Sequence, residues 1–124
     1  MPPVRPNSRP EVESFLPLTA VAFEILLALA AGDQHGYSVM QEVERRTDGR
    51  IVLHPGTSYR ALGRLLDTGV IEELDERPAE GSDDERRRYY RLTPLGHAVA
   101  RAEAERLASQ VNAARARLLR GGPA

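Results

Sequence analysis

Arginine side chains gather in two short segments that contain no acidic residue. Residues 50–64 hold Arg50, Arg60 and Arg64, and residues 86–91 hold four more arginines. Guanidinium groups neutralise nucleic-acid phosphates, and they can also donate two parallel hydrogen bonds to the edge of a guanine. The formal charge of the whole chain is -1, which offers no general attraction to DNA. A prediction of DNA binding therefore depends on these two segments.

The first segment combines its arginines with hydroxyl groups near the start of an expected helix. Proline at position 55 suits the first helical position, because its φ is fixed and it has no N–H to satisfy. Hydroxyl and backbone N–H groups at the beginning of a helix are good partners for phosphate oxygens. The candidate DNA-binding residues here are Thr57, Ser58, Tyr59, Arg60 and Arg64. In the alternative interpretation, the two hydroxyls only complete the helix cap, the tyrosine packs inward and both arginines are solvated.

The second segment lies on an expected β-strand over residues 87–92, in which successive side chains point to opposite faces. Leu92 is expected to point into the core, and Tyr90 with it. Three arginines at the start of the strand are further candidates for DNA contact: Arg86, Arg87 and Arg88. They directly follow three acids at positions 83–85, so an alternative is that they pair with these acids. Exposed ion pairs contribute only about 0–1 kcal/mol, and DNA could compete for the same arginines.

An acidic stretch precedes these arginines. Residues 72–85 contain eight acids against one arginine. Because negative charge repels phosphate, we expect the loop within this stretch to stay off the DNA backbone. A solvated loop is the expected state, and a basic partner or a metal ion is the alternative.

Hydrophobic periodicity and helix-stop signals place the two segments within an ordered series of elements. The expected elements are helices over 20–31, 36–47 and 55–68, strands over 70–74 and 87–92, and a last helix over 94–119. Three helices followed by a β-hairpin are typical of a winged helix-turn-helix, whose third helix can enter a major groove while the hairpin wing lies against the backbone or the minor groove. The predicted fold is mainly α (α+β). It divides into a flexible N-terminal arm (1–15), a DNA-binding domain (16–93) and a dimerisation helix (94–120).

Several short motifs, taken in their order along the chain, resemble the PadR family of transcriptional regulators. The matching pieces are His35-Gly36-Tyr37, Pro55-Gly56-Thr57-Ser58-Tyr59 with Leu62 and Leu65, Gly69-Val70-Ile71, and Tyr89-Tyr90-Arg91-Leu92-Thr93 with Gly96. The resemblance covers residues 16–119, and the single terminal helix resembles the short branch of the family. It implies a homodimeric DNA-binding regulator, often a repressor, and some members respond to phenolic acids or flat hydrophobic drugs. Two features depart from the family: the chain has no Trp for an aromatic sandwich at the dimer centre, and the wing loop is acidic.

The last expected helix carries an apolar seam. Its members are Leu107, Val111, Ala114 and Leu118, at heptad-like intervals of 4, 3 and 4 residues. At about 1.5 Å per residue the helix would be roughly 40 Å long, more than a domain of this size can cover. We therefore expect a second copy of the chain to cover the seam and to form a homodimer. The alternative is packing along its own domain.

Other chemistries find little support in the sequence. Without cysteine there is no disulfide, thiolate metal site or thiol nucleophile. The three histidines lack metal-ligand spacing, and neither a serine-hydrolase elbow nor a glycine-rich phosphate loop is present, so we expect no enzyme, catalytic residue, metal or cofactor. The longest apolar stretch, residues 18–31, is shorter than the roughly 20 residues needed to cross a bilayer. We therefore expect a cytoplasmic protein without membrane contact.

Together these patterns predict a homodimeric transcriptional regulator that reads a palindromic operator in double-stranded DNA. We expect it to act as a repressor. The third helix and the wing would carry the contacts, and a small hydrophobic or phenolic ligand is a candidate effector that releases the DNA. The alternative is a winged-helix module that binds another protein and has no specific DNA binding. The acidic loop and the net charge favour that alternative.

Overall fold

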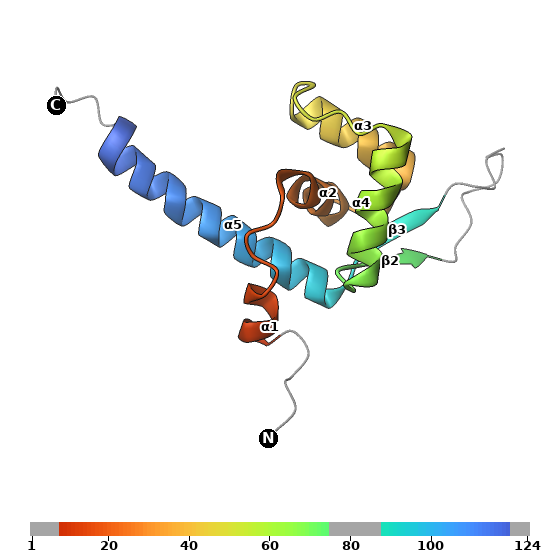
Figure 1. Ribbon diagram of the computed structural model, residues 1–124, viewed down its shortest axis with the longest axis horizontal. Helices are drawn as coiled ribbons and strands as arrows, with labels where there is room; N and C mark the ends of the chain where they lie inside the picture. Colours follow the sequence, from red (N-terminus) through yellow and green to blue (C-terminus); the bar gives the residue numbers. More distant parts are fainter. Residues whose placement is uncertain (1–7, 75–87, 120–124) are drawn as a thin grey trace, which may run out of the picture.

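The computed structural model describes residues 8–74 and 88–119 (Figure 1). Helices dominate, and a small antiparallel sheet packs among them. The elements in chain order are α1 (Arg9–Glu13), α2 (Ala20–Ala30), β1 (Gln34–His35), α3 (Gly36–Arg46), α4 (Pro55–Asp67), β2 (Ile71–Leu74), β3 (Tyr89–Leu92), α5 (Pro94–Ala114) and a π-helical segment, η1 (Arg115–Leu119). This order confirms the predicted winged helix-turn-helix with a long C-terminal helix.

Local hydrogen bonds explain where the helices begin. The Thr19 hydroxyl accepts from the backbone N–H of Ala22 at the start of α2, and the Thr93 hydroxyl accepts from the N–H of Gly96 at the start of α5. Such side-chain caps satisfy N–H groups that have no partner within the helix. At α3 the cap is His35, whose Nδ1 accepts from the N–H of Ser38 at 3.0 Å. His54 occupies the corresponding position before α4, but its side chain makes no capping hydrogen bond.

The sheet has the strand order β1-β3-β2. Strands β2 and β3 pair antiparallel, with Ile71 opposite Leu92, and form the base of the predicted wing. Tyr90 and Leu92 are buried, which confirms the inward face that alternation predicted. Strand β1 adds two residues to the other edge of β3, with Gln34 opposite Tyr90. The sequence did not predict β1, because a two-residue strand has no periodicity of its own.

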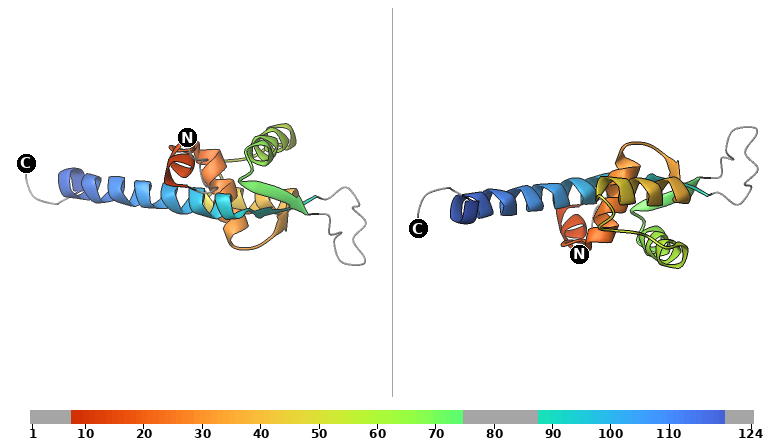
Figure 2. Two further views of the ribbon diagram at one scale, coloured as in Figure 1. Left: turned by 90° about the horizontal axis from the view of Figure 1, so that it is seen from below. Right: turned by 90° about the horizontal axis from the view of Figure 1, so that it is seen from above.

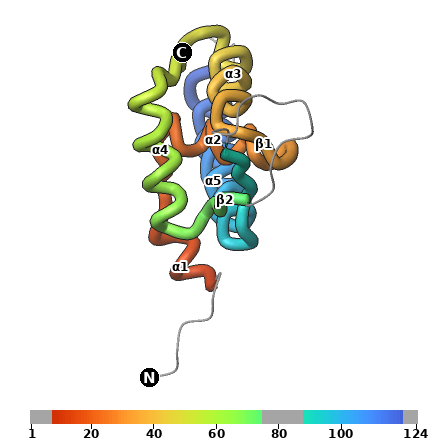
Figure 3. The backbone as a smooth tube through the Cα atoms, turned by 90° about the vertical axis from the view of Figure 1, so that its right-hand side faces the viewer, coloured from red at the N-terminus to blue at the C-terminus, as the bar shows by residue number. Residues whose placement is uncertain are grey.

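The core lies between α2, α3, α4 and the sheet. Its most deeply buried side chains include Ile25, Leu26, Val39, Val43 and Leu62. The start of α5 joins this core by a close approach to the backbone, since a Cβ on Gly96 would lie 1.9 Å from the carbonyl oxygen of Val70. Only glycine fits there. Figures 2 and 3 show α4 at the edge of the bundle, with one long side uncovered by other elements.

Helix α1 lies in the stretch that the sequence led us to expect as a flexible arm. Ser8 caps it by accepting from the N–H of Glu11, and Val12 is buried against the rest of the fold, where α1 packs on α5. A helix of five residues is too short to show a hydrophobic period, so only its tertiary contacts reveal it. Of the expected arm, residues 1–7 lie outside the described residues.

Candidate nucleic-acid interface

Helix α4 presents most of the predicted contact residues on its uncovered side. Thr57, Arg60 and Arg64 are exposed, and Tyr59 is 66 % exposed. The alternative interpretation in which Tyr59 packs inward is therefore wrong. Ser58 is 3 % exposed and faces the core, which leaves little of its hydroxyl for a phosphate.

The burial pattern of α4 follows directly from its sequence. Ser58, Leu62 and Leu65 recur at intervals of 4 and 3 residues and are buried, so they form the inward stripe of an amphipathic helix. Ser58 falls on this stripe, which explains its burial. Residues next to the stripe or opposite it carry the polar and charged side chains into solvent.

The arginines of this protein fall into two groups by their partners. Arg46 is tied to Glu24, at 2.9 Å from Nε to Oε1, and to Glu42, at 2.7 Å. In contrast, Arg60 and Arg64 have no hydrogen-bond or ion-pair partner among the residues that the structure describes. Their guanidinium groups are free to bind an external anion, and phosphate contact is the strongest sequence-independent source of affinity for DNA.

The wing is described only at its base. Arg86 and Arg87 lie outside the described residues. Arg88 is exposed, and its guanidinium lies 3.4 Å from a carboxylate oxygen of Glu73, whose side chain is 39 % exposed. A pair of this kind is weak in water, so a DNA phosphate could replace the glutamate.

An aromatic cluster at the junction of α3 and the wing was not among the predicted site residues. Tyr37, in the first turn of α3, is 54 % exposed, and its ring is stacked near the His35 ring with centroids 6.4 Å apart. The His35 ring also meets the edge of Tyr89, at 5.5 Å. The sequence placed His35-Gly36-Tyr37 at a helix start. Only the fold shows that the His35 ring connects the exposed Tyr37 ring to Tyr89 of β3, the strand that leads out of the wing.

Tyr90, in the central strand of the sheet, is buried, unlike the exposed Tyr37. Burial, reinforced by the negative charge of Glu73, raises the pKa of the Tyr90 phenol above its ordinary value of 10.0. Tyr90 therefore stays neutral, and its role is to fill the core beneath β1 rather than to contact DNA.

A family model described as "Transcriptional regulator PadR-like family" matches residues 25–102, more than half of the chain. The chain belongs to the PadR-like family of transcriptional regulators. The match includes α3, α4 and both strands of the wing, which are the elements that hold the exposed arginines and Tyr37. This PadR-like chain thus belongs to a family of transcriptional regulators and has a winged-helix fold.

Solved structures share the fold. A transcriptional regulator from Clostridium thermocellum has a TM-score of 0.62 and 28 % identity, over 79 % of this chain and 92 % of that one. A PadR family transcription regulator from Clostridium difficile has a TM-score of 0.64 and 24 % identity, over 78 % of this chain and 96 % of that one. In sequence, the chain is 35 % identical over 74 residues to an uncharacterised protein, protein X, from Lysinibacillus sphaericus. That match covers 60 % of this chain and 65 % of the relative.

The predicted dimer seam of this PadR-like chain lies on the far part of α5 and on η1, which extend away from the domain (Figure 2). Leu107 and Ala114 are half-buried, Val111 is 48 % exposed and Leu118 is 77 % exposed. Leu119 adds a further exposed apolar side chain. In the single chain the domain therefore leaves Val111 and Leu118 uncovered.

Two further findings concern other functions. Across residues 8–74 and 88–119, no three histidine or acidic side chains come together as a metal site would require. Within the same residues, no helix has the length and apolar character to span a bilayer.

Proposed function

We propose that this PadR-like protein is a homodimeric repressor that reads a palindromic operator. The observation that carries the proposal is the uncovered side of α4, which exposes Thr57, Tyr59, Arg60 and Arg64. Neither arginine has a partner among the described residues. In a two-fold dimer, two copies of α4 would enter successive major grooves about 34–36 Å apart. A dimer bound in this way blocks other proteins from the same grooves, which is the basis for proposing repression.

The wing would add contacts beside the groove. We infer that Arg88, after exchange of Glu73 for phosphate, acts with Arg86 and Arg87 on the DNA backbone. Tyr37 at the start of α3 would contact the backbone on the same side, because its exposed ring adjoins Tyr89 through His35. Ser58 is left out of this set because it is buried.

The proposed division of labour follows the elements. Residues 16–93 form the DNA-binding unit, and residues 94–120 supply the dimer contact through Leu107, Val111, Ala114 and Leu118. These four side chains lie at coiled-coil spacing, and half of them are largely exposed in the single chain. Pairing two such helices would bury the seam. A small hydrophobic or phenolic effector that releases the DNA is compatible with this arrangement.

Selection of bound sequences from a pool of random duplexes tests the proposal most directly. We expect the purified protein to enrich a palindrome whose half-sites are centred about one helical turn apart. The same selection with an Arg60→Ala, Arg64→Ala double variant should enrich nothing. Recovery of unrelated sequences by the unaltered protein would contradict specific operator binding and would favour the alternative, a winged-helix module whose partner is another protein.

A further inference from the structure

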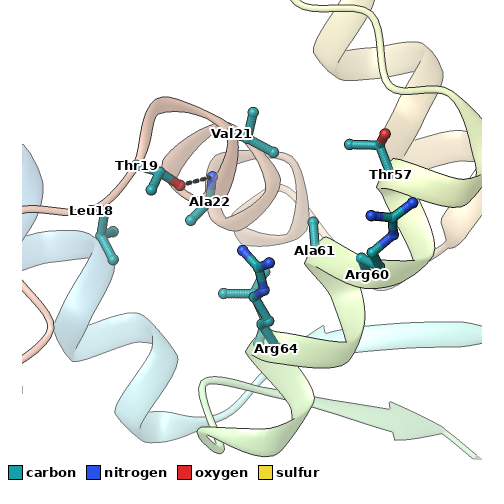
Figure 4. A pocket seen from close by; sticks show the side chains of 9 residues that line it. Leu18, Thr19, Val21, Ala22, Thr57, Arg60, Ala61 and Arg64 are labelled. Atoms are coloured by element: carbon teal, nitrogen blue, oxygen red, sulfur yellow. Dashed lines mark hydrogen bonds between the residues drawn. The ribbon is translucent and has the colours of Figure 1, made fainter.

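A pocket of about 450 Å³ lies between the start of α2 and the outer side of α4 (Figure 4). Its volume falls within the range of about 300–1,000 Å³ that is typical of small-molecule sites. Val21 and Ala22 of α2 and Ala61 of α4 line it with apolar groups, and Leu18 extends the same wall. The Thr19 hydroxyl at its edge is already engaged in capping α2. The floor of the pocket is therefore suited to an apolar body.

The charged groups of the pocket are both positive. Arg60 and Arg64 line the α4 side, and none of the described residues that line the pocket is acidic. Figure 4 shows the guanidinium of Arg64 directed toward α2 near Ala22, and that of Arg60 beside Thr57. Neither guanidinium has a partner elsewhere in the described part of the chain. An occupant must therefore combine an anionic group with an apolar body.

We propose that this pocket binds an amphipathic carboxylate, an acid with an aromatic or a medium-length aliphatic body. Its carboxylate pairs with Arg64 and Arg60 through charge-assisted hydrogen bonds, and its body lies against Val21, Ala22 and Ala61. A bare phosphate or acetate ion leaves the apolar wall uncovered, and an uncharged hydrocarbon leaves the guanidinium groups unpaired. The ligand thus needs both parts.

Binding at this place has a regulatory consequence, which rests on the proposed function. The carboxylate uses the same guanidinium groups that DNA phosphates would use. Ligand and DNA therefore exclude each other directly, without a change in the distance between the two α4 helices of a dimer. Such an effector releases DNA by competition rather than through a distant site.

The first experiment measures ligand binding alone, by following backbone amide signals in ¹H–¹⁵N spectra of the full chain. The probes with both parts are 4-propylbenzoate, which has an aromatic body, and octanoate, which has an aliphatic body. Acetate supplies the negative charge alone, and 1-octanol supplies the aliphatic body alone. We expect one or both larger carboxylates to shift the amides of Ala22 and Ala61 in the millimolar range, and the two partial probes to bind at least about tenfold more weakly. No shift at these amides with either carboxylate overturns the site.

Substitutions then separate the parts of the pocket. Arg64→Ala should weaken carboxylate binding by about tenfold. Arg45→Ala removes the same charge from an exposed arginine that does not line the pocket, and it should leave carboxylate binding unchanged. Ala22→Leu fills the apolar wall and should abolish carboxylate binding while DNA binding persists. Val21→Leu adds a smaller group at a half-buried position and replaces Ala22→Leu if that variant does not fold. Equal carboxylate affinity in the filled variant contradicts the assignment.

The second experiment tests competition, using the anisotropy of a labelled DNA at constant ionic strength. Direct exclusion predicts that the apparent Kd for DNA rises linearly with carboxylate concentration and reaches no plateau. A plateau overturns direct exclusion, since it requires a complex that holds both ligands. If carboxylate shifts the amide signals of Ala22 and Ala61 but the protein binds no DNA, the proposed function fails and the pocket assignment stands.

Discussion

At the scale of single residues, the partners of a charged side chain decide what it can do. Arg46 carries the same charge as Arg60, but its guanidinium is held by Glu24 and Glu42 and serves to join α3 to α2. Arg60 and Arg64 have no such acid among the described residues and lie on a helix with one uncovered side (Figure 3). The difference separates a structural arginine from one that is free to bind an external anion.

Replacement of either available arginine should weaken DNA binding. We expect Arg60→Ala and Arg64→Ala each to lower affinity roughly tenfold or more and to reduce the slope of log K against log salt by about one, because one phosphate contact is lost. Arg101→Ala removes an exposed arginine from another helix, α5, and serves as the matched control. Titrations at several salt concentrations measure both quantities. Unchanged slopes for both α4 variants would count against contact by this helix.

A second prediction at this scale concerns Gly96 and the fit of α5 against the sheet. Gly96→Ala would place a methyl group 1.9 Å from the carbonyl oxygen of Val70, and overpacking of this kind typically costs about 1–3 kcal/mol or more. Gly63→Ala is the control, because nothing lies within 4 Å of the added group and alanine favours a helix interior by about 1 kcal/mol. Urea unfolding should therefore show opposite shifts for the two substitutions. A Gly96→Ala protein as stable as the unaltered one would contradict the close contact.

At the scale of elements, a buried carboxylate connects α5 to the segment between α1 and α2. Glu103 is 1 % exposed, accepts a hydrogen bond from the backbone N–H of Leu18 at 2.8 Å and pairs with Arg106 one turn away. The hydrogen bond from Arg106 and that from Leu18 lower the pKa of Glu103 below its ordinary value of 4.5, although burial acts in the opposite direction. Because a buried carboxylate without partners is costly, this connection fixes how α5 leaves the domain.

This lowered pKa predicts a pH-dependent contribution to stability. A carboxylate whose pKa is lower in the folded state stabilises that state above its ordinary pKa of 4.5, and the contribution is lost as the pH falls through the lower, folded value. Glu103→Gln should therefore reduce the free energy of unfolding at pH 7 by about 1–3 kcal/mol. The difference should shrink in acid, where Glu103 is itself protonated.

Urea unfolding between neutral and acidic pH measures this effect. Glu105→Gln, an exposed neighbour on the same helix, should change stability little at any pH. A Glu103→Gln deficit that stays the same across the whole pH series would mean that the charge of Glu103 contributes nothing.

At the scale of the whole molecule, α5 is the feature that a single chain does not complete. Its first half packs on α1, α2 and β3, and its second half continues into solvent with apolar side chains exposed (Figure 2). The helix from Pro94 to Ala114 is about 30 Å long, so a second copy is the natural cover for its far end.

Removal of the far end of α5 should therefore yield monomers. A chain that ends after Ala108 keeps the pairing of Glu103 with Arg106 but loses Val111, Ala114 and Leu118, and light scattering should give the mass of a single copy. Val111→Glu in the full chain should have the same effect, while Gln110→Glu, an exposed polar neighbour, should not. A dimer that survives both the truncation and Val111→Glu would place the interface elsewhere.

The sequence by itself determined the features that depend on neighbours within one or two turns. Thr19 and Thr93 cap helices through hydrogen bonds to residues three positions later, and the intervals of Leu62 and Leu65 set the inward side of α4. Alternation in the same way placed Tyr90 and Leu92 in the core. These elements in order were enough to predict the winged helix and the family.

Only the tertiary structure decided which distant groups meet. It buried Ser58, left Arg60 and Arg64 without acids, added β1 to the sheet, and joined Glu103 to the N–H of Leu18, 85 positions away. The physical reason is that caps and periodicity arise within a local stretch of chain, whereas burial, ion pairing and pockets depend on how separate segments pack together. Residues 50–64 contain no acid of their own, and the packing pairs Arg60 and Arg64 with no acid among the described residues.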